Sequence, residues 1–275
     1  MASEGLQGHR ARKRFGQNFL HDRHWIERIA KAVNATEGDD IVEIGPGQAA
    51  LTRELIAGAD KVRAVEIDRD LAAWLKETFP ESLSLIEADA LTLDWTQVAK
   101  NDNLRVVGNL PYNISSPLLF KLLEAADHVK DQHFMLQKEV VDRMVAQHGS
   151  KTYGRLSVML QWRYRMQKLF DVPPGAFNPP PKVMSSVVRM IPKAKEEVPS
   201  VDFELFSSVV ANAFSQRRKT IRNALSALLS AEEIAACDVD PGARAEALPL
   251  DAFVRLAQKA EALGRKAVTP GTTVD

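Results

Sequence analysis

The sequence is short of cysteine, of long apolar runs and of net charge. Cys237 is the only cysteine among 275 residues, which excludes an internal disulfide and a zinc site built from several cysteines. No stretch approaches the roughly 20 apolar residues of a membrane span, and the amino terminus lacks the apolar core of a signal peptide. We therefore expect a cytoplasmic protein without a membrane anchor, in which Cys237 fills a small apolar position.

Acidic and basic residues balance at 36 each, so the net charge neither supports nor excludes a polyanionic partner. The distribution of the basic residues says more. Two runs contain no acidic residue, and they comprise Arg10, Arg12, Lys13 and Arg14 near the amino terminus and Arg217, Arg218, Lys219 and Arg222 far downstream. Such runs are most often solvated faces, but two of them in a neutral protein favour a surface that follows phosphates.

Short apolar runs alternate with amphipathic segments between residues 22 and 138. Asp22 is typical of a helix cap and predicts a first helix that ends at Val33. The predicted strands are 41–44, 61–66, 83–87, 104–107 and 133–136, and the helices between them are 49–56, 69–79 and 117–123. This alternation predicts a parallel sheet covered on both faces, with its ligand-binding loops along one edge.

The pattern changes after residue 138. A helix to about residue 147 precedes two segments, 156–165 and 187–191, which we interpret as an antiparallel pair of strands that closes the sheet. Five prolines between residues 173 and 181 predict a stiff, extended segment. Further on, the apolar period predicts helices at 203–214, 219–229, 231–236 and 250–263.

These patterns predict a large α/β domain followed by a small all-α domain. The predicted bounds are a basic arm at 1–21, the α/β domain at 22–193, a linker at 194–201, the helical domain at 202–264 and a disordered tail at 265–275.

The first predicted strand runs into a loop that contains Gly45 and Gly47. Both glycines allow the backbone to approach a ligand closely at the start of the next helix. Together with Ala50 they fit the dinucleotide fingerprint G-x-G-x-x-A, and Glu66, about twenty residues further on, can accept both hydroxyls of a ribose. By itself this pattern leaves NAD and S-adenosylmethionine as equal candidates for the cofactor.

Three features favour the methyl donor. Glu43 stands just before the glycines, in the form that resembles methyltransferase motif I, and a sulfonium cation tolerates a carboxylate that a pyrophosphate would repel. Asp89 follows the third strand, where it can accept from the adenine amino group, although a helix cap is the alternative for this residue. Finally, the fourth strand ends in Asn109-Leu110-Pro111-Tyr112, which has no hydride-transfer residue.

The segment 109–112 suits chemistry on the exocyclic amine of a base. That amine is a poor nucleophile, because its lone pair is delocalised into the ring, and it improves when acceptors hold its hydrogens out of the plane. Asn109 Oδ1 and the Leu110 carbonyl are candidate acceptors, Tyr112 offers a stacking face, and Pro111 fixes the local φ. The alternative is an ordinary turn at the end of a strand with a buried tyrosine.

Six segments together closely resemble the ribosomal RNA adenine N6-dimethyltransferase family, and in particular its bacterial small-subunit branch. These segments are 12–20, 43–47, 109–117, 135–140, 177–183 and 214–223. The resemblance covers residues from about 8 to 260. It implies a Rossmann-like class I S-adenosylmethionine methyltransferase sheet with a small all-α domain, S-adenosylmethionine as cofactor and no metal. It also implies dimethylation of two adjacent adenines in a 3'-terminal hairpin of 16S rRNA, in the small subunit or its precursor, by an enzyme that we expect to be a monomer.

The same resemblance implies roles for single residues. Asn18 and Leu20 would close over the methionine end of the cofactor, with Gly45 and Gly47 behind it. Glu66 would bind the ribose, Asp89 the adenine, and Asn109 would face both the cofactor and the target amine. Tyr112 and Phe177 would stack the flipped base, although Phe177 is alternatively a hydrophobic plug under a stiff turn. The candidate RNA contacts are Arg12, Lys13, Arg14, Lys182, Arg217, Arg218, Lys219 and Arg222, of which Arg218 and Arg222 would share one helix face.

Three other functions compete with this one. The erythromycin-resistance methylases of large-subunit RNA resemble the first domain equally well, but the segment 214–223 argues against them. A non-catalytic RNA-binding assembly factor is opposed by intact Asn109, Glu66 and Asp89. A NAD-dependent oxidoreductase is the third alternative, and it would require a response to NAD.

Overall fold

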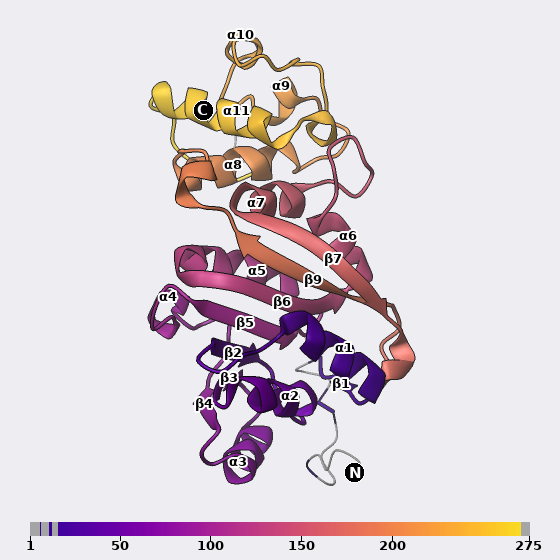
Figure 1. Ribbon diagram of the computed structural model, residues 1–275. Helices are drawn as coiled ribbons and strands as arrows, with labels where there is room; N and C mark the ends of the chain where they lie inside the picture. Colours follow the sequence, from indigo (N-terminus) through magenta and orange to yellow (C-terminus); the bar gives the residue numbers. More distant parts are fainter. Residues whose placement is uncertain (1–5, 7–10, 13–15, 271–275) are drawn as a thin grey trace. The chain divides into compact units, whose positions relative to one another are not determined.

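The computed structural model describes residues 6, 11–12 and 16–270, which form two units (Figure 1). The first unit comprises Met1–Val141 and Arg165–Pro192, and the second comprises Asp142–Tyr164 and Lys193–Asp275. The second unit thus takes up the segment 142–164, which the sequence had placed in the α/β domain. The predicted basic arm lies mostly outside the described residues.

A mixed seven-stranded sheet forms the centre of the first unit (Figure 1). Its strands are β2 (Asp40–Ile44), β3 (Val62–Glu66), β4 (Leu83–Glu87), β5 (Leu104–Asn109), β6 (Val129–Gln137), β7 (Tyr164–Val172) and β9 (Ser185–Pro192). They lie in the order β4-β3-β2-β5-β6-β9-β7; the pairs among β2 to β6 are parallel, and β9 runs antiparallel to β6. The predicted parallel sheet and its antiparallel closing strand at 187–191 are therefore confirmed.

Helices cover the sheet, as the alternating pattern predicts. They are α1 (Arg23–Val33), α2 (Ala50–Ala59), α3 (Arg69–Thr78), α4 (Trp95–Val98), α5 (Ser115–Leu122) and the 3-10 helix η2 (Leu123–His128). Asp22 caps α1 by accepting from the backbone N–H groups of His24 and Trp25, so the predicted start is confirmed. Buried residues of α1 and α2, such as Ile29 and Leu55, form one core with residues of β2, β3 and β5.

The strand order reverses direction between β2 and β5, because β3 and β4 extend the sheet on one side of β2 while β5 and β6 extend it on the other. The loops that leave β2 and β5 therefore diverge to opposite sides, and a crevice opens between them at the carboxyl ends of the strands. Open α/β sheets bind their ligands at this point.

A second, two-stranded sheet joins the amino-terminal segment to the proline-rich segment. β1 (Phe19–Leu20) pairs antiparallel with β8 (Phe177–Asn178), and Leu20 is the register partner of Phe177. Two-residue strands leave no periodic signal, so the sequence did not reveal this pairing. The proline-rich segment also contains a 3-10 turn, η3 (Pro174–Ala176), and is not extended throughout as predicted.

The predicted strand at 156–165 is wrong. Residues Arg155–Arg163 form helix α7, and strand β7 begins only at Tyr164. Leu156, Met159 and Leu160 are buried at helical spacing, but Val158 between them is buried as well. A short run that is apolar on all sides does not distinguish a helix from a strand. The preceding helix α6 (Lys138–Met144) is also shorter than predicted.

Helices make up most of the regular structure of the second unit, as predicted. After α7 they are η4 (Lys195–Glu197), α8 (Phe203–Ala213), α9 (Ile221–Ala224), α10 (Ala231–Ala235), η5 (Ala245–Ala247) and α11 (Leu250–Ala262). The predicted helix at 219–229 shrinks to α9, because Thr220 forms an isolated antiparallel bridge with Arg244 and residues 225–228 form a bend and turns. Residues 214–220 are a loop, so Arg218 and Arg222 do not share a helix face.

The carboxyl-terminal segment was expected to be disordered. Within its described part, the Val268 N–H donates to Ser208 Oγ at 2.8 Å, and the Val268 carbonyl accepts from Asn212 Nδ2 at 3.0 Å. This part of the predicted tail is therefore held against α8, while residues 271–275 lie outside the described residues. In the described chain no helix is long and apolar enough to cross a membrane.

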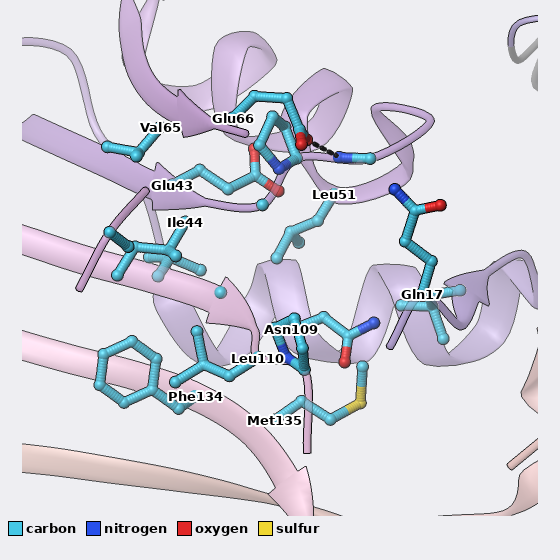
Figure 2. A pocket seen from close by; sticks show the side chains of 18 of the residues that line it. Gln17, Glu43, Ile44, Leu51, Val65, Glu66, Asn109, Leu110, Phe134 and Met135 are labelled. Carbon is cyan, nitrogen blue, oxygen red and sulfur yellow. Dashed lines mark hydrogen bonds between the residues drawn. The ribbon is translucent and has the colours of Figure 1, made fainter. Parts of the chain in front are cut away.

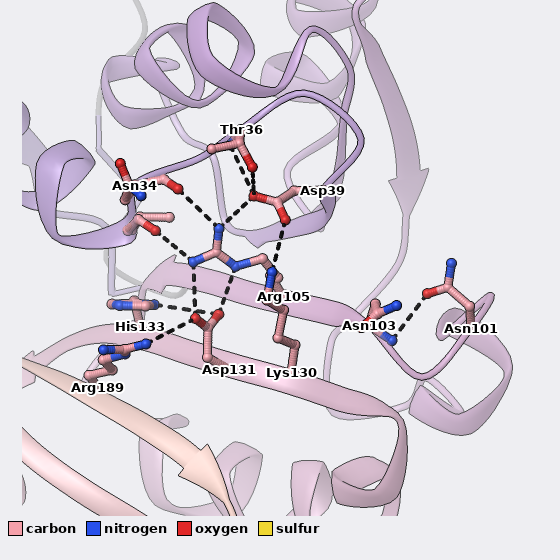
Figure 3. Close-up of polar contacts among 11 residues, drawn as sticks. Asn34, Thr36, Asp39, Asn101, Asn103, Arg105, Lys130, Asp131, His133 and Arg189 are labelled. Atoms are coloured by element: carbon pink, nitrogen blue, oxygen red, sulfur yellow. Dashed lines mark hydrogen bonds and ion pairs between the residues drawn. The ribbon is translucent and has the colours of Figure 1, made fainter.

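A buried ionic network ties α1 to the amino ends of β5 and β6 (Figure 3). Arg105 donates to both oxygens of Asp131, at 2.9 and 3.0 Å, and to Asp39 Oδ2 at 2.7 Å. It also donates to the Val33 carbonyl at the end of α1, at 2.6 Å. Burial raises the pKa of Asp39, but hydrogen bonds from Thr36 and Arg105 outweigh this effect and lower it to about 2. The network therefore fixes the strands whose other ends carry the site.

Candidate active site

A cavity of about 310 Å³ opens at the carboxyl ends of β2, β3 and β5, within the first unit (Figure 2). Its walls are the loop after β2, the ends of β3 and β4, the segment 109–114 and the amino-terminal residues 16–20, which we call the strap. A volume of this size is typical of small-molecule sites. The cavity brings together all seven residues for which the sequence predicted a cofactor role.

Gly45 and Gly47 form the floor of the cavity in conformations that other residues avoid. Their φ values are +65° and +57°. A Cβ on Gly47 would also lie 3.1 Å from Phe19 Cδ1, because the strap packs directly on the loop. A glycine is thus required at position 47 by the positive φ and by the lack of space for a Cβ beside Phe19 of the strap.

Glu66 lies at the end of β3 and faces the glycine loop. Its Oε2 accepts from the Gly47 N–H at 3.3 Å, the dashed line in Figure 2, and its Oε1 accepts from the Asp68 N–H at 2.9 Å. Burial raises the pKa of Glu66, and these backbone hydrogen bonds oppose the rise. The carboxylate is therefore held in a fixed orientation, with acceptor capacity remaining for ligand hydroxyls.

Glu43 is a second buried carboxyl on the cavity wall. It is 3% exposed, and its Oε2 accepts from Thr52 Oγ1 at 2.6 Å. Burial raises the pKa of Glu43 to about 7, against the hydrogen bond from Thr52 and with a further contribution from Glu66. A carboxyl in this state gains from a nearby cation, since a positive charge stabilises its ionised form.

Asp89 and Ile67 line the cavity beyond Glu66. Asp89 Oδ1 accepts from the Leu91 N–H at 2.9 Å and so closes a local turn. The cap of α4 is Asp94, so the helix-cap alternative for Asp89 is wrong. Ile67 is 45% exposed although it is apolar, which suits a flat ligand ring. We missed Ile67 in the sequence; its position between Glu66 and the next helix was the available signal.

The strap is tied to the walls of the cavity through two adjacent residues. Asn109 Nδ2 donates to the Asn18 carbonyl at 3.0 Å, and Gln17 Nε2 donates to Asp68 Oδ2 at 3.1 Å. Arg12, just before the strap, pairs with Asp68 at 2.9 Å and also with Asp70. The structure thus places Arg12 against carboxylates at the cofactor side, whereas Lys13 and Arg14 lie outside the described residues.

The segment 109–112 leaves β5 in a tight turn. The Leu110 N–H donates to the Met135 carbonyl at 3.1 Å, and the Pro111 carbonyl accepts from the Ile114 N–H at 3.2 Å. Figure 2 shows Asn109 beside Met135, on the side of the cavity that faces Gln17. Tyr112 is half-buried, lines the cavity and lies with its OH 2.7 Å from Ser185 Oγ. Burial raises the pKa of the Tyr112 phenol, and the contact with Ser185 opposes this shift.

Phe177 does not join the other site residues. It is 2% exposed and packs in the core with Leu20, Val172 and Val187, and it is not part of the cavity wall. Its backbone pairs with Leu20 of the strap. In this conformation Phe177 is the hydrophobic plug that the sequence offered as the alternative.

The remaining candidate RNA contacts are exposed. Lys182 lies just before β9 in the first unit, and the basic segment Arg217, Arg218, Lys219 and Arg222 lies in the second unit. Arg217 Nη2 donates to the Lys151 carbonyl at 2.8 Å. Over the described residues, no group of His, Cys, Asp and Glu side chains is arranged to hold a metal ion.

Two solved structures share this fold over most of the chain. A dimethyladenosine transferase from Plasmodium falciparum superposes with a TM-score of 0.79 at 25% identity, over 91% of this chain and 100% of that one. The 23S rRNA methyltransferase ErmE superposes with a TM-score of 0.69 at 26% identity, over 89% and 100% of the two chains. The class of protein is therefore that of the Rossmann-like methyltransferases, as the sequence predicted.

Sequence comparisons identify a family within this class of methyltransferases. The model of the ribosomal RNA adenine dimethylase family matches residues 8–261, and the chain belongs to that family. The ribosomal RNA small subunit methyltransferase A of Acinetobacter baylyi is 54% identical over 92% of this chain and 93% of its own length. The protein of the same name from Thiobacillus denitrificans is 57% identical over 87% and 94%. The resemblance drawn from six segments is confirmed, and the oxidoreductase alternative is wrong.

Proposed function

We propose that this protein uses S-adenosylmethionine to dimethylate N6 of two adjacent adenines in a 3'-terminal hairpin of small-subunit rRNA. The observation that carries this proposal is the hydrogen bond between Asn109 Nδ2 and the Asn18 carbonyl. Because this bond fixes the Nδ2 end of the Asn109 amide on the strap, the Oδ1 end is left as an acceptor at the cavity, where a target amine needs one.

The residues of the cavity fit S-adenosylmethionine, which supplies the methyl group when it is bound. Glu66 is oriented to accept the ribose hydroxyls, and Asp89 and Ile67 suit the polar edge and the flat face of adenine. Glu43 provides the buried carboxyl that a cationic sulfonium favours. Asn18, Leu20, Gly45 and Gly47 would enclose the methionine end.

The chemistry needs orientation more than a base. Asn109 Oδ1 and the Leu110 carbonyl would accept the two amine hydrogens and so favour the tetrahedral nitrogen of the transition state over the planar nitrogen of the ground state. The protonated product amine is a strong acid and loses its proton to water. The turn at Pro111 holds both acceptors in register, and this positioning supplies most of the acceleration.

Tyr112 would hold the target base after it leaves the RNA stack. Unstacking costs a few kcal/mol, and stacking on an aromatic ring returns roughly 1–3 kcal/mol. The sequence assigned a second stacking face to Phe177. Since Phe177 is buried and is the cross-strand neighbour of Leu20, we propose that it supports the strap and does not stack the base.

Lys182 and the basic segment 217–222 would neutralise RNA phosphates, together with Lys13 and Arg14. Arg218, Lys219 and Arg222 are exposed, which suits phosphate contacts. Arg12 is the exception: its pairing with Asp68 and Asp70 favours a role at the strap over a phosphate contact.

The comparisons support small-subunit RNA over large-subunit RNA. Relatives named for the small subunit are 54% and 57% identical to this chain, whereas ErmE, named for 23S rRNA, is 26% identical. A helical domain at 202–264 that binds RNA remains part of this proposal.

The decisive experiment offers the protein S-adenosylmethionine with a labelled methyl group and small subunits that lack the modification. The RNA is then digested, and the nucleosides are identified by mass. We expect N6,N6-dimethyladenosine in small-subunit RNA and none in large subunits treated in parallel. Absence of dimethyladenosine from the small subunits would refute the proposal.

A paired variant tests the phosphate contacts. Replacing Arg218 and Lys219 by Gln should weaken RNA binding and reduce the slope of log K against log salt by about 1–2, because up to two phosphate contacts are lost. Lys76→Gln, at an exposed position of α3, is the charge-matched control for one lysine. An unchanged salt slope would remove this segment from the RNA contacts.

A further inference from the structure

Ser185 contacts the hydroxyl group of Tyr112. Its Oγ lies 2.7 Å from the Tyr112 OH, although the two residues are 73 positions apart in the sequence. Ser185 is 1% exposed and is the first residue of β9, where it pairs with Gln137 of β6. Next to it, the Met184 carbonyl accepts from the Lys138 N–H at 2.9 Å. The serine hydroxyl is thus presented by rigid backbone, not by a mobile loop.

The contact with Ser185 holds the Tyr112 side chain at its hydroxyl. At the backbone, the Tyr112 carbonyl accepts from Ser115 Oγ at 3.2 Å, within the turn that follows β5. A tyrosine side chain turns about two torsions, and because its hydroxyl oxygen lies on the χ2 axis, the contact at the hydroxyl restricts χ1, which sets the direction in which the ring points. Without Ser185 the ring would keep its stacking area but lose its fixed direction.

We propose that Ser185 is a positioning residue, which holds the Tyr112 ring in one orientation through two successive methyl transfers to the same nitrogen. The inference rests on the proposed function. After the first transfer the amine carries a methyl group and one hydrogen, so fewer hydrogen bonds to Asn109 and the Leu110 carbonyl hold the base. The orientation of the stacking ring then matters more, and a ring free to pivot lets the monomethylated base slide out of line.

The neighbouring Ser186 is a matched control. It is also fully buried and, like Ser185, is not among the residues that line the cavity, but its Oγ donates to Asp171 Oδ1 at 2.5 Å. Successive residues of a strand point to opposite faces, so Ser185→Ala and Ser186→Ala each remove one buried hydroxyl from the same strand. Only the first loses the contact with Tyr112.

The experiment measures N6-monomethyladenosine and N6,N6-dimethyladenosine in small subunits after multiple turnovers. The proteins compared are the wild type, Ser185→Ala, Ser186→Ala, Tyr112→Phe and the double variant Ser185→Ala/Tyr112→Phe. Melting temperature and the affinity for S-adenosylmethionine are recorded for each. Tyr112→Phe keeps the ring and removes only the hydroxyl.

We expect Ser185→Ala to lower the rate of the second transfer about five- to tenfold, as the loss of one hydrogen bond implies. Monomethyladenosine should accumulate, while cofactor affinity stays within twofold and the melting temperature matches that of Ser186→Ala. Tyr112→Phe should show the same product ratio, and the double variant should be no worse than either single one, because both remove the same contact. Ser185→Thr, which retains the hydroxyl, should restore the wild-type ratio.

Two results would overturn the inference while leaving the proposed function intact. One is a wild-type product ratio in Ser185→Ala, and the other is an additive loss in the double variant. If the wild-type protein itself formed no dimethyladenosine, the proposed function would fail and this inference with it.

Discussion

The two ends of β5 and β6 place buried polar groups in opposite situations. At the amino ends, Arg105 and Asp131 satisfy each other, and Asp39 completes the set. At the carboxyl ends, Asn109 on β5 uses its donor on the strap and retains its acceptor at a cavity. The same strands thus carry a closed network at one end and an open one at the other.

Polar groups that are paired within the protein differ in their energetics from polar groups that are left for a ligand. A buried charge is costly unless it is paired, so the closed network stabilises the fold once all its members are present. Beside the open end, the neighbouring strands β2 and β3 contribute Glu43 and Glu66, whose pKa values are raised by burial, and among the described residues no basic side chain is recorded as opposing this rise. Groups held in such a state are available to a ligand, and they weaken the protein without one.

The largest effect is expected at the closed end. Arg105→Met removes the nearest cation of Asp131 and Asp39 and leaves them the more distant Arg189 at 3.8 Å and Lys130 at 3.3 Å, so the free energy of unfolding should fall by about 3–5 kcal/mol. Urea denaturation followed by circular dichroism measures this loss. Lys76→Met, which breaks the exposed pair with Glu87, is the control and should cost less than about 1 kcal/mol. Equal losses of unfolding free energy in the two variants would show that the closed network stabilises the fold no more than an exposed ion pair.

Asn109→Ala should produce the reverse pattern at the open end. Methyl transfer should fall by about 100- to 1000-fold, the usual effect of losing a group that acts on the transition state, while unfolding changes little. Single-turnover methyl transfer and urea denaturation measure the two parts. Asn103→Ala, at the exposed turn before β5, is the control. Full activity in Asn109→Ala would contradict the role given to its amide.

Glu43→Gln should change how stability depends on pH. The folded protein holds the Glu43 proton up to about pH 7, whereas the unfolded chain loses it near pH 4.5, so this carboxyl destabilises the fold increasingly as pH rises through that interval. The variant should therefore gain stability over the wild type between pH 5 and pH 8, by up to about 3 kcal/mol. Denaturation curves across this range test the sign. A constant difference would show that Glu43 is ionised throughout, and Glu37→Gln, at an exposed carboxyl, is the control.

Gly47→Ala should have the smallest effect of the four. The positive φ costs about 1 kcal/mol, and the contact with Phe19 adds to it by displacing the strap. We expect roughly tenfold weaker binding of S-adenosylmethionine in titration calorimetry. Gly38→Ala is the matched control, because Gly38 has φ +85° and nothing within 4 Å of its Cβ position. Equal affinity for S-adenosylmethionine in the two variants would show that the contact between Gly47 and the strap does not affect binding.

Local patterns predicted the parts of the fold that local forces decide. Asp22 caps α1, and the alternating segments up to β6 form the parallel sheet as expected. The errors fall where tertiary contacts override the local pattern. The helix expected at 219–229 starts only at Ile221 because Thr220 bridges Arg244, and the strand expected at 156–165 is mostly helix α7, whose residues 156–160 are all buried.

The cavity shows the same division. Gly47, Glu66, Asp89 and Asn109 were predicted from their positions after successive strands, since parallel strands place their carboxyl ends at one edge. The hydrogen-bond partners that fix the side chains around the cavity could not be predicted. They are the Asn18 carbonyl for Asn109, Asp68 for Gln17 and Ser185 for Tyr112. Each of them is far away in the sequence, and no periodicity connects them.

The sequence by itself determined the class of fold, the family and most of the polar residues that line the cavity, because these depend on strand order and on short contiguous motifs. Only the tertiary structure decided which end of the Asn109 amide faces the strap, that Arg12 pairs with Asp68 and Asp70, and that Phe177 is buried beside Leu20. These outcomes depend on the packing of the strap across the cavity, where groups distant in sequence compete for the same hydrogen bonds and the same buried space.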